Sequence, residues 1–267
     1  MIDCKTIAAE RKKLIRDRVD SIGYPIELLV IQVGDDPASN SYIKGKKADC
    51  EEVGIVFHHM HYDWKITTER ITKYIQEANH DPRICGIIVQ LPLPAHLDKT
   101  KILNTIADEK DVDGFKPTSK FIPCTPLGIK TILDSIGVDV DRKICCVIGR
   151  GGVGKPMVDL LTKNNATVIW CNSHTPAAEL KRLVKLSDIV ISATGISSLI
   201  KEVRDDQIVI DVGITRGEDG KLYGDVDKSC YSDDKLITPV PGGVGLMTRV
   251  ELLENTIDAA CGWARSN

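Results

Sequence analysis

The fold is decided at residues 147–156, VIGRGGVGKP, where an apolar run enters a glycine-rich turn and leaves into a helical pattern. Gly149, Gly151 and Gly154 have the G-x-G-x-x-G spacing that lets backbone approach a pyrophosphate at a helix N-terminus. A glycine turn between strand and helix can also serve packing alone. Here, however, strands are predicted over 144–148 and 166–171, on either side of one helix. Together these elements predict the βαβ unit of a dinucleotide-binding domain.

The end of the second strand indicates which dinucleotide binds. An Asp or Glu about 20 residues after the glycines would hydrogen-bond a ribose 2′-hydroxyl. The strand ends instead in Asn172-Ser173-His174-Thr175, and Arg150 lies within the glycine turn. Because this lining is neutral to basic, it favours a 2′-phosphate. We therefore predict NADP as the cofactor, in preference to NAD.

Two later strands, predicted over 188–193 and 207–212, extend the same sheet. They lead into Thr194-Gly195 and Gly213-Ile214, and parallel sheets of this kind bind ligands at the carboxyl ends of their strands. The predicted cofactor-binding residues are Gly149, Arg150, Gly151, Gly154, Ser173, His174, Thr194, Gly195 and Ile214.

Composition limits the class of protein. The chain has 267 residues, of which 42% are hydrophobic and 27% charged, as in an ordinary globular protein with room for two α/β units. Its formal net charge of -3 gives no basic footprint for nucleic acid. No apolar run approaches the roughly 20 residues of a membrane span, and the N-terminus does not resemble a signal peptide. We therefore expect a cytoplasmic protein.

Cysteine and histidine raise the question of a metal site. The nine cysteines are odd in number and include no C-x-x-C pair, so we interpret them as small core residues in a reducing compartment. His59 and His61 would share one face of a strand. Without a Cys or carboxylate nearby in sequence, a solvated strand end is favoured. We predict no metal.

A candidate catalytic pair lies on a helix predicted from about residue 38 to 53. Tyr42 and Lys46 are four residues apart, which places their side chains on one helix face. By themselves they are more typical of a surface pair among several lysines. The functional alternative is that the ring flanks a flat substrate while the amine exchanges protons with it.

Polar residues follow another predicted strand, over 84–89. Gln90 and Leu91 stand at its carboxyl end, before two prolines that fix an extended loop, so Gln90 is placed to face a site. Asp113 lies in a turn, residues 111–114, that resembles the start of a calcium loop but lacks the remaining ligands. We exclude calcium and retain a substrate-binding carboxylate as a possibility.

Two helix starts and one turn complete the local predictions. Thr125 is predicted as an N-cap with Pro126 at the first helical position, and Thr248 with Glu251 as a capping box. A polar hairpin turn is predicted over 216–221.

Several segments resemble the bifunctional methylenetetrahydrofolate dehydrogenase/cyclohydrolase family in sequence and in order. They are VGDDPASNSYIKGKKADCEEVGI, GIIVQLPLPAHLD, KDVDGFKP, PCTPLGI, SDIVISATG and ITPVPGGVG, and they extend over nearly the whole chain. The resemblance implies two α/β domains with an interdomain cleft that holds folate, the second being a Rossmann-type domain, and a homodimer. The implied folate and catalytic domain is 1–120, completed by a C-terminal helix 246–267, and the NADP-binding domain is 121–245.

The resemblance also implies roles for single residues. Lys46 matches the catalytic lysine of the family's YxxxK motif, Tyr42 the ring that stacks on folate, and Gln90 the partner of the lysine. Asp113 matches the carboxylate that holds the pterin. The implied catalytic residues are Lys46, Tyr42, Gln90 and Asp113, and the implied substrate-binding residues are Tyr42, Gln90, Leu91, Asp113, Pro241, Gly242 and Gly243.

The chain departs from the family pattern at three places. Gly151 stands where a serine is usual, in a cofactor turn that is one residue shorter. Leu246 replaces the proline of the GGVGPMT segment, and Cys4 occupies a glycine position near the N-terminus. None of these departures removes a candidate catalytic residue.

The predicted function is oxidation of 5,10-methylenetetrahydrofolate with NADP, followed by hydrolysis of the methenyl product to 10-formyltetrahydrofolate. Two alternatives remain at this point. One is a dehydrogenase without cyclohydrolase activity, suggested by the altered turn. The other is a non-catalytic dinucleotide or folate sensor on the same fold.

Overall fold

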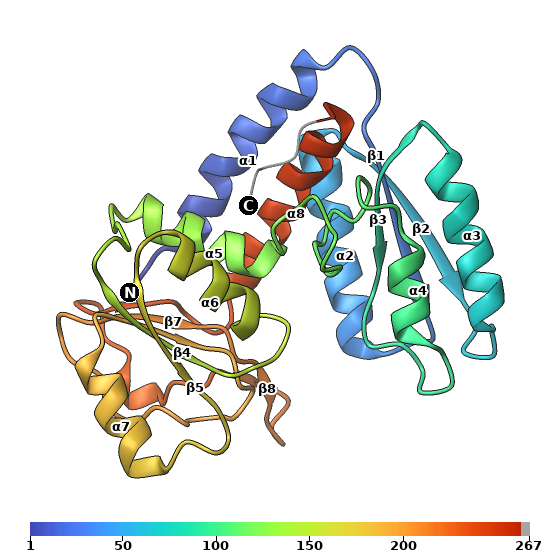
Figure 1. Ribbon diagram of the computed structural model, residues 1–267. Coiled ribbons are helices and arrows are strands. Elements are labelled where there is room, and N and C mark those ends of the chain that lie inside the picture. Colours follow the sequence, from blue (N-terminus) through green and yellow to red (C-terminus); the bar gives the residue numbers. More distant parts are fainter. Residues whose placement is uncertain (263–267) are drawn as a thin grey trace. The chain divides into compact units, whose positions relative to one another are not determined.

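The computed structural model describes residues 1–262, which form two compact units (Figure 1). The three-stranded unit consists of Glu10–Cys124 and the segment that starts at Arg249. The five-stranded unit consists of Met1–Ala9 and Thr125–Thr248. The chain therefore passes between the units within its first helix, between Cys124 and Thr125, and within its last helix.

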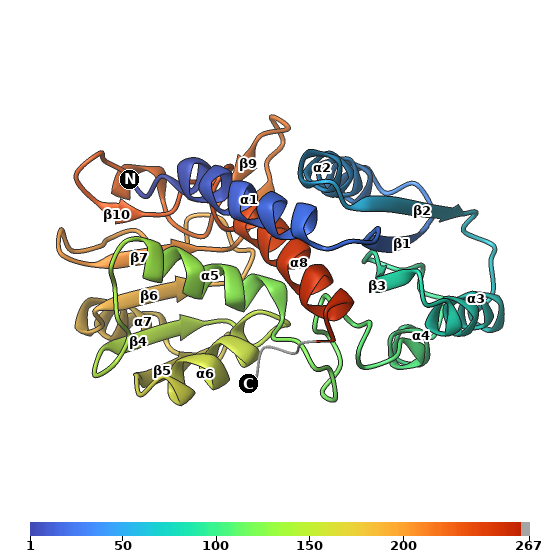
Figure 2. The same cartoon turned by 90° about the horizontal axis from the view of Figure 1, so that it is seen from above.

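The three-stranded unit contains a parallel sheet of order β2-β1-β3. Its strands are β1 (Glu27–Val33), β2 (Val56–Tyr62) and β3 (Ile84–Val89), and its helices are α2 (Pro37–Val53), α3 (Thr68–His80) and α4 (Lys99–Thr105). Figure 2 shows α2 on one side of this sheet and α3 with α4 on the other. The order changes direction at β1, whose neighbours β2 and β3 both follow it in the chain.

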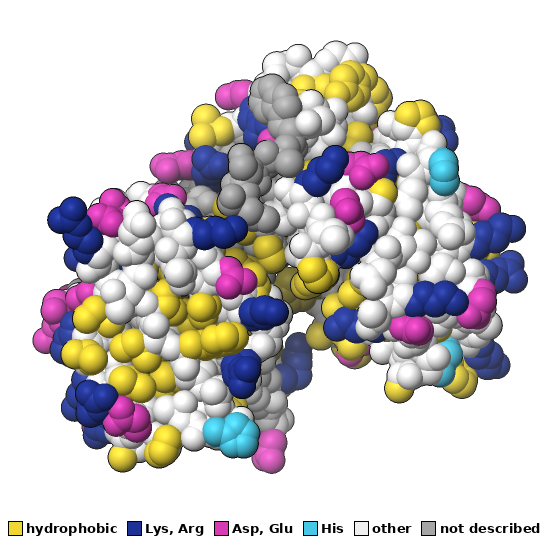
Figure 3. All heavy atoms as spheres, viewed as in Figure 1, with side chains coloured by type: hydrophobic (Ala, Val, Ile, Leu, Met, Phe, Trp, Pro, Cys, Tyr) yellow, Lys and Arg dark blue, Asp and Glu magenta, His cyan; other side chains and the backbone are white. Residues whose placement is uncertain are grey.

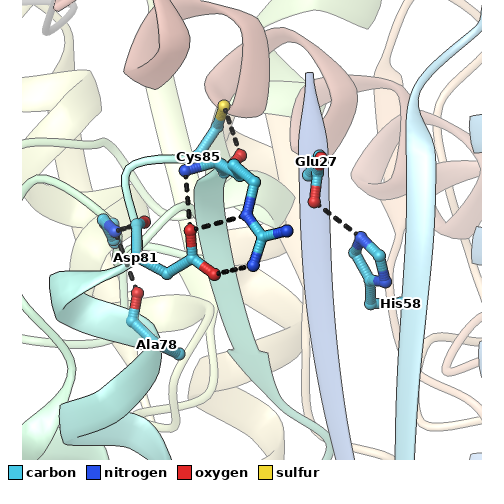
Figure 4. Close-up of polar contacts among 7 residues, drawn as sticks. Glu27, His58, Ala78, Asp81 and Cys85 are labelled. Carbon is cyan, nitrogen blue, oxygen red and sulfur yellow. Dashed lines mark hydrogen bonds and ion pairs between the residues drawn. The ribbon is translucent and has the colours of Figure 1, made fainter. Parts of the chain in front are cut away.

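Alternation along the strands explains this layering, because successive side chains of a strand point to opposite faces. Leu29, Ile31 and Val33 of β1 are buried in one cluster with Ile71 and Ile75 of α3. The Thr67 hydroxyl accepts from the backbone N–H of Arg70 and caps α3. At the amino ends of the strands, a carboxylate oxygen of Glu27 lies 2.7 Å from His58 Nε2 on β2 (Figure 4).

The five-stranded unit contains a fully parallel sheet of order β10-β7-β6-β4-β5. Its strands are β4 (Ile144–Ile148), β5 (Thr167–Cys171), β6 (Ile189–Ser192), β7 (Ile208–Asp211) and β10 (Leu236–Ile237). Figure 1 shows α5 (Cys124–Ser135) and α6 (Gly154–Lys163) on one side of the sheet and α7 (Ala177–Leu186) on the other. The hairpin of β8 (Thr215–Arg216) and β9 (Leu222–Tyr223) confirms the predicted turn, and η1 (Lys228–Cys230) precedes β10.

This order is Rossmann-type, and the βαβ unit predicted from the glycine turn is confirmed as β4-α6-β5. Strand β4 has β5 on one side and β6 on the other, so the order reverses at β4. Ligands of such sheets bind outside the carboxyl ends of the strands at that reversal. The glycine turn directly follows β4.

In the last helix, α8 (Val244–Ala260), both apolar and polar side chains are buried. Within the three-stranded unit, Arg11 of α1 (Cys4–Ser21) donates to Glu254 at 2.8 Å, and Arg18 pairs with Glu254 and Asp258. Asn255 donates to the backbone oxygen of Val112 at 2.9 Å. These partners stabilise the buried charged residues of the helix.

Two local predictions are wrong. Helix α5 begins at Cys124, so Thr125 is inside it and is not its N-cap. Helix α8 begins at Val244, so Thr248 is also internal, and its hydroxyl donates to the Val244 backbone oxygen rather than capping the helix. The predicted helix 246–267 is observed over Val244–Ala260, while 263–267 lie outside the described residues.

Within residues 1–262, no helix combines the length and the apolar character that crossing a membrane requires.

Candidate functional site

Lys46 is a buried lysine on the inner face of α2. It is 8% exposed and shares this face with Ile43, Asp49 and Cys50, at helical spacing. Asp36 caps the helix by accepting from the backbone N–H of Ser39 at 2.7 Å, which fixes where the helix starts. Tyr42, one turn before Lys46, is 37% exposed. The alternative of a surface Tyr-Lys pair is therefore wrong for the lysine, since only the ring reaches the surface.

Gln90 is the hydrogen-bond partner of Lys46. The Lys46 Nζ donates to Gln90 Oε1 at 3.0 Å, and Gln90 Nε2 donates to the Leu91 backbone oxygen at 2.9 Å. The backbone N–H of Gln90 donates to Ile31 of β1, so Gln90 stands at the carboxyl edge of the sheet beside the strand where the order changes. This is where the strand-end argument places it.

Asp113 lies close enough to Lys46 for their charges to interact. Burial raises the pKa of the Asp113 carboxyl, while the Lys46 ammonium and a hydrogen bond from the Cys124 thiol act in the opposite direction. The backbone N–H of Cys124 also donates to the Asp113 backbone oxygen at 3.4 Å. The three-stranded unit thus brings Tyr42, Lys46, Gln90, Leu91 and Asp113 together from one helix, one strand end and one turn.

Two residues of this site were missed in the sequence. Ser39 is 5% exposed and its hydroxyl donates to the Leu91 backbone oxygen at 3.2 Å, which ties the start of α2 to the loop after β3. Cys124 is 1% exposed and contacts Asp113. Ser39 carries a sequence signal, since it stands three residues after an N-cap aspartate. Cys124 carries none.

In the five-stranded unit, the turn after β4 has the shape of a phosphate cradle. Gly149 has φ of 115°, and a Cβ there would overlap the Ala193 backbone oxygen. A Cβ at Gly154 would overlap the Gly149 backbone oxygen. At Gly151 and Gly152, by contrast, a Cβ would meet nothing within 4 Å, so the turn is open on its outer side. A dinucleotide fits this cradle, because backbone N–H groups at the start of α6 are accessible to a pyrophosphate.

The other predicted cofactor residues follow neighbouring strands of the same sheet. Ser173 and His174 are exposed at the tip of a turn after β5, which closes where the His174 N–H donates to Asn172 Oδ1 at 2.9 Å. Thr194 and Gly195 follow β6, and Ile214, which is 45% exposed, follows β7. Since all these strands are parallel, the predicted cofactor residues lie along one edge of the sheet.

A buried carboxylate that the sequence reasoning missed organises part of this edge. Asp225 is 0% exposed and accepts from the Thr194 N–H at 2.7 Å, the Thr194 hydroxyl at 2.8 Å and the Ile196 N–H at 2.9 Å. Asp211, at the end of β7, accepts in turn from the Asp225 N–H at 2.9 Å. Burial raises the pKa of the Asp211 carboxyl.

Pro241, Gly242 and Gly243 form the turn between β10 and α8, at the carboxyl edge of the same sheet. The Val240–Pro241 peptide bond is cis, as is Leu91–Pro92. The predicted substrate-binding residues therefore belong to both units.

His59 and His61 do share one strand face, with their rings stacked at 5.7 Å between centroids. In the described part of the chain, no group of three or more His, Cys, Asp or Glu residues has the arrangement of a metal site.

The fold and the glycine cradle define a two-unit α/β protein with a Rossmann-type nucleotide domain. Residues 2–113 match the model of the tetrahydrofolate dehydrogenase/cyclohydrolase catalytic domain, and 123–263 match the NAD(P)-binding domain of the same family. The chain belongs to the tetrahydrofolate dehydrogenase/cyclohydrolase family.

Similar proteins agree with this membership. The bifunctional protein FolD of Geobacillus thermodenitrificans is 44% identical, over 96% of this chain and 94% of the relative. The crystal structure of the bifunctional FolD dehydrogenase/cyclohydrolase of Campylobacter jejuni is similar with a TM-score of 0.93, at 40% identity and 98% coverage of both chains. The Trypanosoma brucei enzyme, solved with NADP and an inhibitor, gives a TM-score of 0.93 at 30% identity and covers 100% of this chain and 98% of its own.

Proposed function

We propose that this protein oxidises 5,10-methylenetetrahydrofolate with NADP and hydrolyses the methenyl product to 10-formyltetrahydrofolate. The observation that carries the proposal is the buried Lys46, held by Gln90 next to Asp113 and one helical turn from Tyr42. The residues 1–120 with the C-terminal helix are proposed as the folate and catalytic domain, and 121–245 as the cofactor domain.

The first step transfers a hydride from the methylene carbon of the substrate and leaves a cationic methenyl group. Bound NADP supplies the hydride acceptor. The protein contributes orientation: the exposed Tyr42 ring offers an apolar face for the flat pterin, and Asp113 an acceptor for its N–H groups. Pro241, Gly242 and Gly243 are proposed as further substrate-binding residues.

The second step adds water to the methenyl carbon, releases one proton and opens the ring to the formyl group. Lys46 is proposed to accept that proton as the water adds. Its hydrogen bond to Gln90 Oε1 fixes the position of the Lys46 nitrogen at the site.

The preference for NADP rests on charge at the cofactor edge. Arg150, Ser173 and His174 are all exposed there, and no acidic residue follows β5 before the turn closes. A 2′-phosphate adds about two negative charges, which an arginine binds through a charge-assisted pair. We expect a lower Michaelis constant for NADP than for NAD, and equal constants would refute the preference.

A homodimer is proposed from the edge of the three-stranded sheet. Among residues 1–262, strand β2 pairs with β1 alone, and it exposes Val56 and Met60, each 41% accessible. An exposed apolar edge strand is a typical surface for pairing with another chain. Nucleic acid is not a proposed partner, because on the face drawn in Figure 3 Lys and Arg alternate with Asp and Glu. We propose that the protein acts in the cytoplasm.

Turnover by the purified protein tests the function. We expect reduced-cofactor absorbance with methylenetetrahydrofolate and NADP, and decay of added methenyltetrahydrofolate above the uncatalysed rate. Decay at the uncatalysed rate would mean that the protein is a dehydrogenase without cyclohydrolase activity. Absence of both signals would leave only a binding protein.

A further inference from the structure

Trp170 is a large aromatic residue at a position where the sheet has no structural need for one. It lies on the edge strand β5 and is 38% exposed, opposite Val147 of β4 in the strand register. Its indole Nε1–H donates to the Gly149 backbone oxygen at 2.7 Å. The next residue, Cys171, accepts from the Gly149 N–H at 3.0 Å. Two successive residues of β5 therefore hold both polar groups of the first glycine in the cofactor turn.

The same ring lies against Arg150. The guanidinium carbon of Arg150 is 5.2 Å from the centroid of the Trp170 ring, within the range of a cation–π contact. Within residues 1–262, no Asp or Glu forms an ion pair with Arg150. The ring thus fixes the direction of the guanidinium, while its N–H donors stay available to an anion.

The contacts from Trp170 matter because the turn around Arg150 is rich in glycine. Arg150 stands between Gly149 and two further glycines, Gly151 and Gly152. A Cβ atom at Gly151 or Gly152 would meet no other atom within 4 Å. Glycine leaves the backbone more conformations than any other residue, and a free arginine has many rotamers. Ordering both at the moment of binding would weaken recognition of a phosphate, whereas a side chain that is already oriented avoids that loss.

We propose that Trp170 is a positioning residue that determines cofactor specificity: through Gly149 and Arg150 it sets the preference for a 2′-phosphate. This inference rests on the proposed use of NADP. It adds a residue that does not itself contact the phosphate, and it predicts that the preference depends on the face and the N–H of an indole on a neighbouring strand.

The test compares Trp170→Leu and Trp170→Phe with the parent. Removing the ring should lower the ratio of kcat/KM for NADP to kcat/KM for NAD about tenfold, from the size of an exposed cation–π contact together with one hydrogen bond. Trp170→Phe keeps a ring face but loses the N–H donor, so its ratio should fall between those of the parent and Trp170→Leu. A merely structural role would lower both kcat/KM values in parallel and leave the ratio unchanged.

Trp64→Leu is the matched control. Trp64 is also exposed, at 59%, and also has a cation near its ring, since Lys65 Nζ is 5.9 Å from the centroid. It lies in the three-stranded unit, and its replacement should leave the ratio at the parent value. Hydrolysis of methenyltetrahydrofolate without cofactor reports whether each variant is folded.

A coupling experiment identifies the route. In an Arg150→Leu background, Trp170→Leu should change the cofactor ratio no further, because the group it positions is gone. Binding of adenosine 2′,5′-bisphosphate and of AMP, measured by calorimetry, needs no turnover and so separates this inference from the proposed function. If the parent binds the bisphosphate better and Trp170→Leu reduces that difference, the inference holds even where turnover is absent. If the ratio and the binding difference both stay within twofold of the parent in Trp170→Leu, the inference is overturned.

Discussion

At the scale of single residues, the site depends on a lysine that is removed from water. Lys46 is 8% exposed, whereas the neighbouring Lys47 is an exposed side chain that pairs with Glu51 at 3.7 Å. Position on the buried face of α2 is thus what distinguishes the proposed base from the lysines around it. The sequence shows the Tyr42 and Lys46 spacing, but not which face of the helix is buried, because that depends on elements packed from elsewhere.

Replacing Lys46 should separate the two activities. We expect Lys46→Met to slow methenyltetrahydrofolate hydrolysis at least ~100-fold, because a general base typically contributes ~10²–10⁴-fold. Hydride transfer requires no proton from this residue, so dehydrogenase activity should survive where substrate still binds in register. Gln90→Ala should give a milder form of the same effect. Lys47→Met is the control, and hydrolysis near the parent rate in Lys46→Met would show that the lysine is not the base.

Asp113 should make stability depend on pH in a defined direction. Its folded-state pKa is raised, so the folded state binds more protons than the unfolded state above pH about 4, near the pKa of a free Asp. Its contribution to stability is therefore present at low pH and is lost as pH rises through the folded value. The melting temperature of Asp113→Asn, relative to the parent, should rise over that window.

Asp219 should change stability with pH in the direction opposite to Asp113. A backbone hydrogen bond from Lys221 lowers its pKa, together with one from the Tyr223 hydroxyl. The stability of the parent relative to Asp219→Asn should therefore increase as pH rises toward about 4, and the difference should stay constant above that pH.

For Asp113→Asn, a difference in melting temperature from the parent that does not change with pH would mean that the Asp113 carboxyl is not desolvated.

At the scale of elements, the strands were predictable and two helix starts were not. The runs 84–89 and 144–148 are largely apolar, as parallel strands buried on both faces require, and both are observed as predicted. The capping box at Thr248 failed because α8 starts four residues earlier and is buried, with Glu251 0% exposed. Its polar residues find partners on α1, more than two hundred positions away, which no local pattern reveals.

The carboxylate of Asp225 also acts on a distant element, because it accepts hydrogen bonds from the turn after β6. In Asp225→Asn only one of the two oxygens remains an acceptor, so the side chain loses its bond from either the Thr194 N–H or the Ile196 N–H. We expect a loss of roughly 2–4 kcal/mol in stability, as hydrogen bonds to a buried charged group are among the stronger ones. Weaker NADP binding should accompany it.

Urea unfolding and cofactor titration measure these two effects. Asp227→Asn is the control, because Asp227 caps the short helix η1 by accepting from the Ser229 N–H at 2.9 Å. If Asp225→Asn unfolded and bound NADP like the parent, the turn would not depend on this carboxylate.

At the scale of the whole molecule, the candidate site was predicted as two separate sets of residues, one for folate and one for cofactor. The structure places the first set mostly in the three-stranded unit and the second in the five-stranded unit. The glycine spacing and the strand ends account for most of both sets. Trp170 and Asp225 escaped because their roles depend on side chains that reach across strands, and a sequence read locally does not show such contacts.

The proposed dimer gives a whole-molecule prediction. Substituting Val56→Lys and Met60→Lys places two charges on the exposed edge of β2 and should shift the protein toward the monomer, because charge on an edge strand opposes pairing. Sedimentation equilibrium measures the mass. Leu186→Lys, at a 50% exposed position on α7, should leave the mass unchanged. A monomeric parent would contradict the proposal outright.

One progress curve tests the central claim that a single protein performs both reactions. Purified protein is mixed with 5,10-methylenetetrahydrofolate and NADP, and reduced cofactor and 10-formyltetrahydrofolate are measured over the same interval. We predict that reduced cofactor appears at once and that formyl product accumulates faster than added methenyltetrahydrofolate hydrolyses without protein. Reduced cofactor with formyl product only at the uncatalysed rate would contradict the second activity, and no reduced cofactor would contradict the account as a whole.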